Sequence, residues 1–81
     1  MPYITQEQRE AIETFGHGAI KTAGELNYYI TRVLQTYLLH NQNYGRYNEV
    51  LGVLEAVKLE LYRRKVAPYE DKKIKENGDV W

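Results

Sequence analysis

The feature that most constrains the fold of this chain is the stretch from Asn48 to Pro68, which has the pattern of one long helix. Its apolar residues, with the tyrosine before it, recur every three or four positions and so share one helix face. They are Tyr47, Val50, Leu51, Leu54, Val57 and Leu61. Val53 and Leu59 add apolar surface beyond what one neighbouring helix covers. Pro68 should end the helix, because proline lacks the backbone N–H that would continue it.

A capping box at Thr5 and Gln8 predicts the start of a short first helix. In such a box the threonine side chain binds a backbone N–H three residues on, and the glutamine side chain reaches back to the threonine N–H. The helix should end near Thr14, because two glycines follow it. Ile4 and Ile12 are predicted to be its main apolar contacts.

A second capping box, at Thr22 and Glu25, predicts a longer helix that runs from Ala23 to about His40. Its apolar residues again have the spacing of a single buried face. Beyond the proline, two more helical turns are predicted to begin near Tyr69, and the Asn-Gly pair at Gly78 should stop them.

These elements predict an all-α fold made of a short N-terminal helix, a long antiparallel helical hairpin, and a short C-terminal helix or tail. Two long helices joined by a short polar loop favour such a hairpin. At 81 residues the chain has the size of one small domain. Because its apolar residues occupy more faces than one hairpin can hide, we expect a homo-oligomer, most simply a helical dimer or a ring built on the third helix.

The composition argues against catalysis. The chain has no Cys and no Ser, so it lacks the commonest nucleophilic side chains. Its two histidines, His17 and His40, fall on different predicted loops and outside any metal-binding motif. We therefore expect no enzyme activity, no metal site and no cofactor.

The charge balance and the hydropathy limit the partners. Lysine plus arginine equals aspartate plus glutamate, at 11 each, so nucleic-acid binding is not expected. No segment approaches the roughly 18 apolar residues of a membrane span, and the N-terminal residues lack the apolar run of a signal peptide. We predict a cytoplasmic protein that does not bind membranes.

Lys21 and Thr22 form the first candidate binding site for a phosphorylated ligand. They place a cation and a hydroxyl at the predicted start of a helix, where free backbone N–H groups attract anions. Tyr28, six residues beyond Thr22, could stack against a ligand. In the alternative interpretation Thr22 is only the helix cap and Lys21 is a solvated flank.

The second candidate site is formed by Tyr62, Arg63 and Arg64, with Tyr69 beyond the proline. Guanidinium groups bind phosphate through paired hydrogen bonds, and tyrosine rings offer a surface on which a base can stack. In the alternative interpretation these cations simply stabilise a helix C-terminus, and nearby glutamates neutralise them.

Several motifs spread over residues 20–80 resemble a family of small uncharacterised phage and bacterial proteins. They are Gly24-Glu-Leu-Asn-Tyr28, Asn48-Glu-Val50, Gly52-Val-Leu-Glu55, Tyr62-Arg-Arg64, Ala67-Pro-Tyr-Glu-Asp71 and Asn77-Gly-Asp-Val80. This resemblance implies no activity. If the protein is phage-encoded, the predicted compartment is the host cytoplasm.

The predicted architecture is also similar, more loosely, to that of phage sponge proteins. Those proteins form oligomers that sequester cyclic-nucleotide immune signals and so block bacterial antiphage defence. The likeness is architectural and matches no motif residue by residue. With the two cationic sites, the many tyrosines and the lack of catalytic groups, it favours a non-enzymatic homo-oligomer that binds a small phosphorylated ligand. We expect Lys21 and Thr22 to bind the phosphate, and Arg63 and Arg64 to neutralise it across a subunit interface. The alternative is a protein–protein interaction module without a small-molecule ligand.

Overall fold

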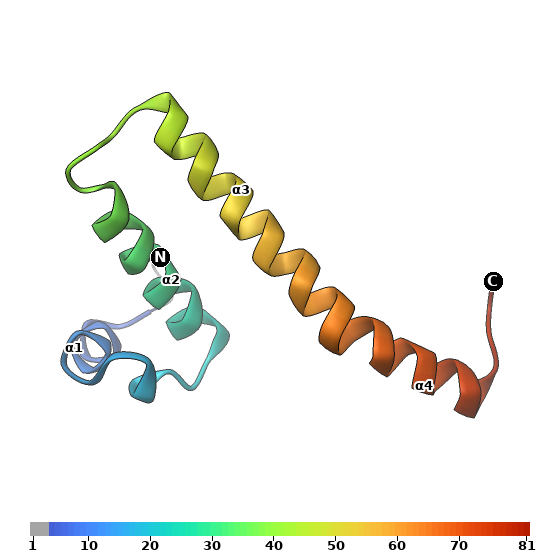
Figure 1. The fold of residues 1–81 in the computed structure, drawn as a ribbon. Helices are drawn as coiled ribbons and strands as arrows, with labels where there is room; N and C mark the ends of the chain where they lie inside the picture. The colour runs from blue at the N-terminus through green and yellow to red at the C-terminus, as the bar shows by residue number, and fades with distance from the viewer. Residues whose placement is uncertain (1–3) are drawn as a thin grey trace. The chain divides into compact units, whose positions relative to one another are not determined.

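The computed structural model describes residues 4–81, and every regular element within them is a helix (Figure 1). The elements are α1 (Gln6–Phe15), the 3₁₀ turn η1 (Gly16–Ala19), α2 (Ala23–Leu38), α3 (Tyr44–Leu61), the π-helical turn η2 (Tyr62–Val66) and α4 (Ala67–Asn77). The predicted all-α class is therefore confirmed. The chain divides into two compact units, one up to Asn43 and one from Tyr44 to Trp81. The antiparallel hairpin and the oligomer stay predictions.

The first unit is built on the predicted capping box. The backbone N–H of Gln8 donates to Thr5 Oγ1 at 3.1 Å, and the Thr5 N–H donates to Gln8 Oε1 at 2.7 Å. Two of the four backbone donors that a helix start leaves free are thus satisfied, which fixes the first turn of α1. The predicted apolar contacts are also confirmed, since Ile4 and Ile12 are only 3% and 4% exposed.

Glycine ends α1 as the sequence predicted. Gly16 has a φ of 64°, a left-handed conformation that glycine adopts without strain, and its N–H donates to the carbonyl of Ile12. The η1 turn then leads to α2, whose observed span ends at Leu38, two residues before the predicted end.

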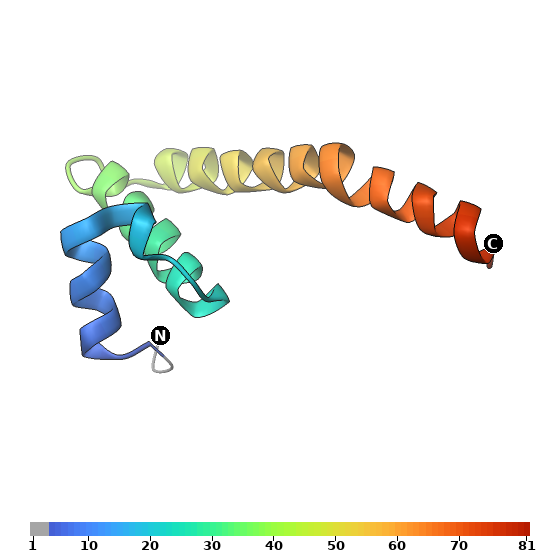
Figure 2. The ribbon, with the colours of Figure 1, turned by 90° about the horizontal axis from the view of Figure 1, so that it is seen from below.

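The second unit contradicts the prediction that Pro68 ends the long helix. The helical path continues from α3 through η2 into α4 without a loop (Figure 2). At the end of η2 the Ala67 N–H donates to the carbonyl of Tyr62, five residues back. A wider π turn of this kind makes room where the proline ring would clash with the carbonyl four residues before it. The predicted stop at Gly78 is confirmed, with a φ of 85°.

Pro68→Ala should turn η2 into ordinary α-helix. The change restores a backbone N–H and removes the ring that conflicts with i→i+4 hydrogen bonding. Because proline costs about 3 kcal/mol in a regular helix and the π turn relieves part of that cost, we expect a gain of about 1 kcal/mol in the free energy of unfolding. Circular dichroism melts report the gain, and amide exchange reports the new hydrogen bond at position 68. If the five-residue hydrogen bond at Ala67 survives in the variant, Pro68 is not the cause of the π turn.

Candidate functional site

At the start of α2, the predicted site of Lys21 and Thr22 already holds a carboxylate. Thr22 Oγ1 accepts a hydrogen bond from the Glu25 N–H at 3.1 Å, which confirms Thr22 as the helix cap. Glu25 Oε1 accepts from the Lys21 N–H at 3.0 Å, and the Glu25 residue is only 7% exposed. Glu25 therefore supplies the negative charge that a helix N-terminus favours. A phosphate bound here would have to displace it, and the ligand role of Lys21 and Thr22 stays a prediction.

Glu25→Gln should reduce the loss in the free energy of unfolding that occurs as the pH falls below neutrality. The Lys21 N–H that donates to the Glu25 carboxylate holds the pKa of Glu25 below its usual value of 4.5, against the opposing effect of burial. A lowered folded-state pKa contributes stability above the unfolded-state pKa, and that contribution is lost as the pH falls through the folded-state value. Urea unfolding between pH 7 and pH 3 measures the difference. Glu55→Gln, at a solvated ion pair with Lys58, is the control, and it should leave the pH dependence of the free energy of unfolding nearly unchanged.

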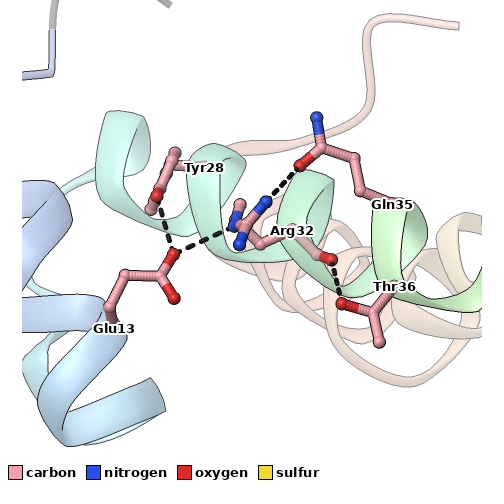
Figure 3. A network of polar contacts seen from close by, with 5 residues as sticks. All are labelled: Glu13, Tyr28, Arg32, Gln35 and Thr36. Atoms are coloured by element: carbon pink, nitrogen blue, oxygen red, sulfur yellow. Dashed lines mark hydrogen bonds and ion pairs between the residues drawn. The ribbon is translucent and has the colours of Figure 1, made fainter. Parts of the chain in front are cut away.

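Tyr28 lies in a polar network that joins α1 to α2 (Figure 3). Its hydroxyl donates to Glu13 Oε1 at 2.8 Å, and Arg32 Nε donates to the same oxygen at 2.9 Å. The Tyr28 hydroxyl and the Arg32 guanidinium lower the pKa of Glu13, while the hydrogen bond to Glu13 raises the pKa of Tyr28. Arg32 Nη1 also donates to Gln35 Oε1 at 2.9 Å. The predicted stacking tyrosine is thus held by its hydroxyl, beside a guanidinium.

Sequence reasoning missed Glu13 and Arg32 as partners of Tyr28. Tyr28 and Arg32 are four residues apart and share one helix face, which is a signal that the sequence does carry. Glu13 lies in another helix, and no local spacing connects it to them.

The second predicted site lies on and beside the π turn. Arg63 Nη2 lies 3.1 Å from Glu60 Oε1, and Arg64 Nε donates to the same oxygen. The Tyr62 hydroxyl donates to Glu70 at 2.8 Å, so the pKa of Tyr62 is raised. The predicted neighbouring glutamates are therefore present. Since two guanidinium groups share one carboxylate, a positive charge remains on this segment.

Tyr69 is the remaining residue predicted for this site, and it lies in the first turn of α4. Tyr69 is 61% exposed, and Lys73 Nζ lies 5.5 Å from its ring centroid. At that distance an ammonium group is attracted to the face of an aromatic ring. The exposed ring retains a free surface for stacking, although a lysine already lies over part of it.

A further candidate surface is apolar and follows α3. Five residues at alternating spacings of three and four form what we call the α3 seam: Tyr47, Val50, Leu54, Val57 and Leu61. This spacing is the one by which helices pair through interlocking side chains. Val50 is buried, whereas Val57 and Leu61 are 60% and 57% exposed. Outside the seam, Val53 and Leu59 are equally exposed, at 58% and 57%. The α3 helix thus presents apolar side chains on more than one face.

Two kinds of site are not found in the part of the chain that the structure describes. Among residues 4–81, no three His, Asp or Glu side chains gather as metal ligands would. No helix within these residues has the length and apolar character needed to cross a bilayer.

A family model described as a domain of unknown function (DUF6899) matches residues 1–80. Neither a curated protein nor a solved structure matches the chain.

Proposed function

The chain belongs to the DUF6899 family, and on the basis of its exposed helical surface we propose that it is a non-enzymatic interaction protein that forms a homo-oligomer through the α3 seam. Membership of a family without an assigned activity agrees with the resemblance found in the sequence. The observation that carries the proposal is the exposure of large apolar side chains along α3. Leu51, Val57 and Leu61 each remain more than half exposed in the single chain.

A second copy of the chain is the partner that best fits this surface. Soluble monomers rarely expose contiguous apolar patches larger than a few hundred Å². The three-four spacing of the α3 seam suits an identical helix, because the same side chains act as knobs and as holes in both copies. Burying the surface of the seam residues that is still exposed, on both copies, contributes several kcal/mol toward the entropic cost of association.

Sedimentation velocity of the purified protein over a range of concentrations tests this proposal. We expect a species of at least twice the chain mass, with dissociation only on strong dilution. A protein that stays monomeric at high concentration would contradict self-assembly. In that case, a stoichiometric protein partner recovered from the source cell would support the alternative, a module that binds a different protein.

The second candidate function is binding of a small phosphorylated ligand, such as a cyclic nucleotide immune signal. It is favoured by the positive charge that remains where Arg63 and Arg64 share the carboxylate of Glu60. In this proposal the guanidinium groups bind phosphate, and the exposed rings of Tyr62 and Tyr69 stack on bases. Calorimetric titration with cyclic dinucleotides and trinucleotides tests it. Binding that is lost in Arg63→Ala supports the site, and no heat with any of these ligands contradicts it.

A further inference from the structure

A small hollow in the first unit lies between α1 and α2, outside both of the binding sites predicted from the sequence except for Tyr28. It has a volume of about 170 Å³ and is lined by Ile4, Arg9, Tyr28, Thr31, Arg32 and Gln35. Two arginines from different helices therefore border one concave site. The hollow lies next to the network of Figure 3, which fixes one of these arginines through Glu13.

The uncommitted polar groups around this hollow are mainly donors. Arg9 donates from Nη1 to the Ile4 carbonyl at 3.4 Å and from Nη2 to Gln6 at 2.7 Å. Arg32 donates to Glu13 and to Gln35. A guanidinium carries five N–H groups, so three on each arginine have no partner among the described residues. The amide nitrogen of Gln35 also keeps both of its N–H groups, because only its oxygen is engaged.

The hydroxyl groups at the site are already committed as donors. Tyr28 donates to Glu13, and Thr31 Oγ1 donates to the carbonyl of Asn27 at 2.8 Å. The net charge of the lining is also positive, since Arg9 and Arg32 line the hollow, no carboxylate of the described residues does, and only Arg32 is paired with a neighbouring carboxylate, that of Glu13. A ligand here therefore has to be an acceptor of hydrogen bonds and an anion.

From these donors, charges and dimensions we infer that the hollow between Arg9 and Arg32 binds a tetrahedral oxyanion, the phosphoryl group of a small metabolite or free phosphate. One water occupies about 30 Å³ in the liquid, so the hollow holds the equivalent of five or six waters. That space suits a phosphoryl group and is smaller than the 300–1,000 Å³ of a typical site for a whole drug-sized ligand. Any larger part of the ligand extends into solvent. The site does not depend on assembly through α3.

The test is titration of the full-length, ¹⁵N-labelled protein with inorganic phosphate at constant ionic strength, followed at the arginine Nε–H signals. We expect saturable shifts at Arg9 and Arg32. Arg9→Gln should weaken binding about tenfold or more, because it removes charge-assisted hydrogen bonds without touching the Glu13 network. Lys58→Gln, which removes one positive charge from an exposed ion pair in the second unit, is the matched control and should leave the affinity unchanged. Equal weakening by both variants, or none by Arg9→Gln, would overturn the inference.

Glu13→Gln tests whether the hollow binds an anion or whether Arg9 and Arg32 only stabilise the fold. The glutamine retains an oxygen for Tyr28 and Arg32 but removes the negative charge beside the hollow. We expect phosphate to bind about fivefold more tightly, because repulsion of one charge at close range is worth roughly 1 kcal/mol in water. Unchanged or weaker binding in a folded variant would contradict the site. Parallel titration with a phosphomonoester such as glycerol phosphate distinguishes the sources: tighter binding than free phosphate identifies a phosphorylated metabolite, and equal binding identifies phosphate itself.

Discussion

Under the proposed assembly through the α3 seam, replacing Leu54 and Val57 together by aspartate should give a monomer whose helices remain intact. Both residues lie on the α3 seam, and in the single chain they are 36% and 60% exposed, so the new carboxylates remain solvated there. In the paired state the same carboxylates would be buried without partners, at a cost of several kcal/mol. The lost burial of the exposed parts of these two side chains adds about 1.5–3 kcal/mol for each copy. Because 1.4 kcal/mol corresponds to a factor of ten, dissociation should increase by a thousandfold or more.

The control for this prediction is the pair Val53→Asp and Leu59→Asp. It replaces the same two residue types on the same helix, at positions that are 58% and 57% exposed but lie outside the seam. Light scattering gives the mass of each variant, and circular dichroism confirms that the helices persist. We expect the control to remain assembled. If the control dissociates and the seam variant does not, assembly uses a different face of α3.

Local features of this fold could be predicted from the sequence because they depend on neighbouring residues. The Thr5 and Thr22 caps set the starts of α1 and α2, and the glycines at positions 16 and 78 set two helix ends. Each of these signals acts within about four residues, which is the range of helix capping. The same holds for the apolar spacing of the α3 seam.

Pro68 shows where a local rule fails. Proline breaks the i→i+4 pattern, and the sequence therefore predicted the end of the helix at this residue. The structure instead changes the hydrogen-bond spacing over Tyr62–Val66 and carries the helix onward to Asn77. A π turn has no simple sequence signature. It forms only where the residues beyond the proline gain more free energy by remaining helical than the altered hydrogen bonding costs.

The candidate sites could be predicted only in part, for a related reason. Lys21 and Thr22 have the residue types of an anion site, but the carboxylate of Glu25 already interacts with that helix start. Conversely, Arg9 and Arg32 lie 23 positions apart in the sequence and meet only because α1 packs on α2. Periodicity identifies the face on which a residue lies within its own helix, whereas it does not identify the residue opposite.

Ile12→Ala should unfold most of the first unit while α3 and α4 remain helical. Ile12 is 4% exposed, and with Ile4 it is one of two buried apolar residues among the described residues of that unit. Removing three carbon atoms from a buried isoleucine costs about 2–5 kcal/mol through lost burial and the cavity that remains. A unit of about 40 residues has a free energy of unfolding on the order of 2–6 kcal/mol, so one such substitution removes most of that stability.

Amide hydrogen exchange resolved by residue, at a fixed protein concentration, measures this effect separately in the two units. Phe15→Ala is the control, because it removes a larger side chain from the same helix at a position that is 73% exposed. Its cost should be within about 0.5 kcal/mol, as for most surface substitutions. If Phe15→Ala destabilises α1 more than Ile12→Ala does, then Phe15 is covered in solution and the isoleucine pair is not the core of the unit. If instead Ile12→Ala lowers protection equally along the whole chain, the two units unfold together, and α3 and α4 depend on the isoleucine pair for their stability.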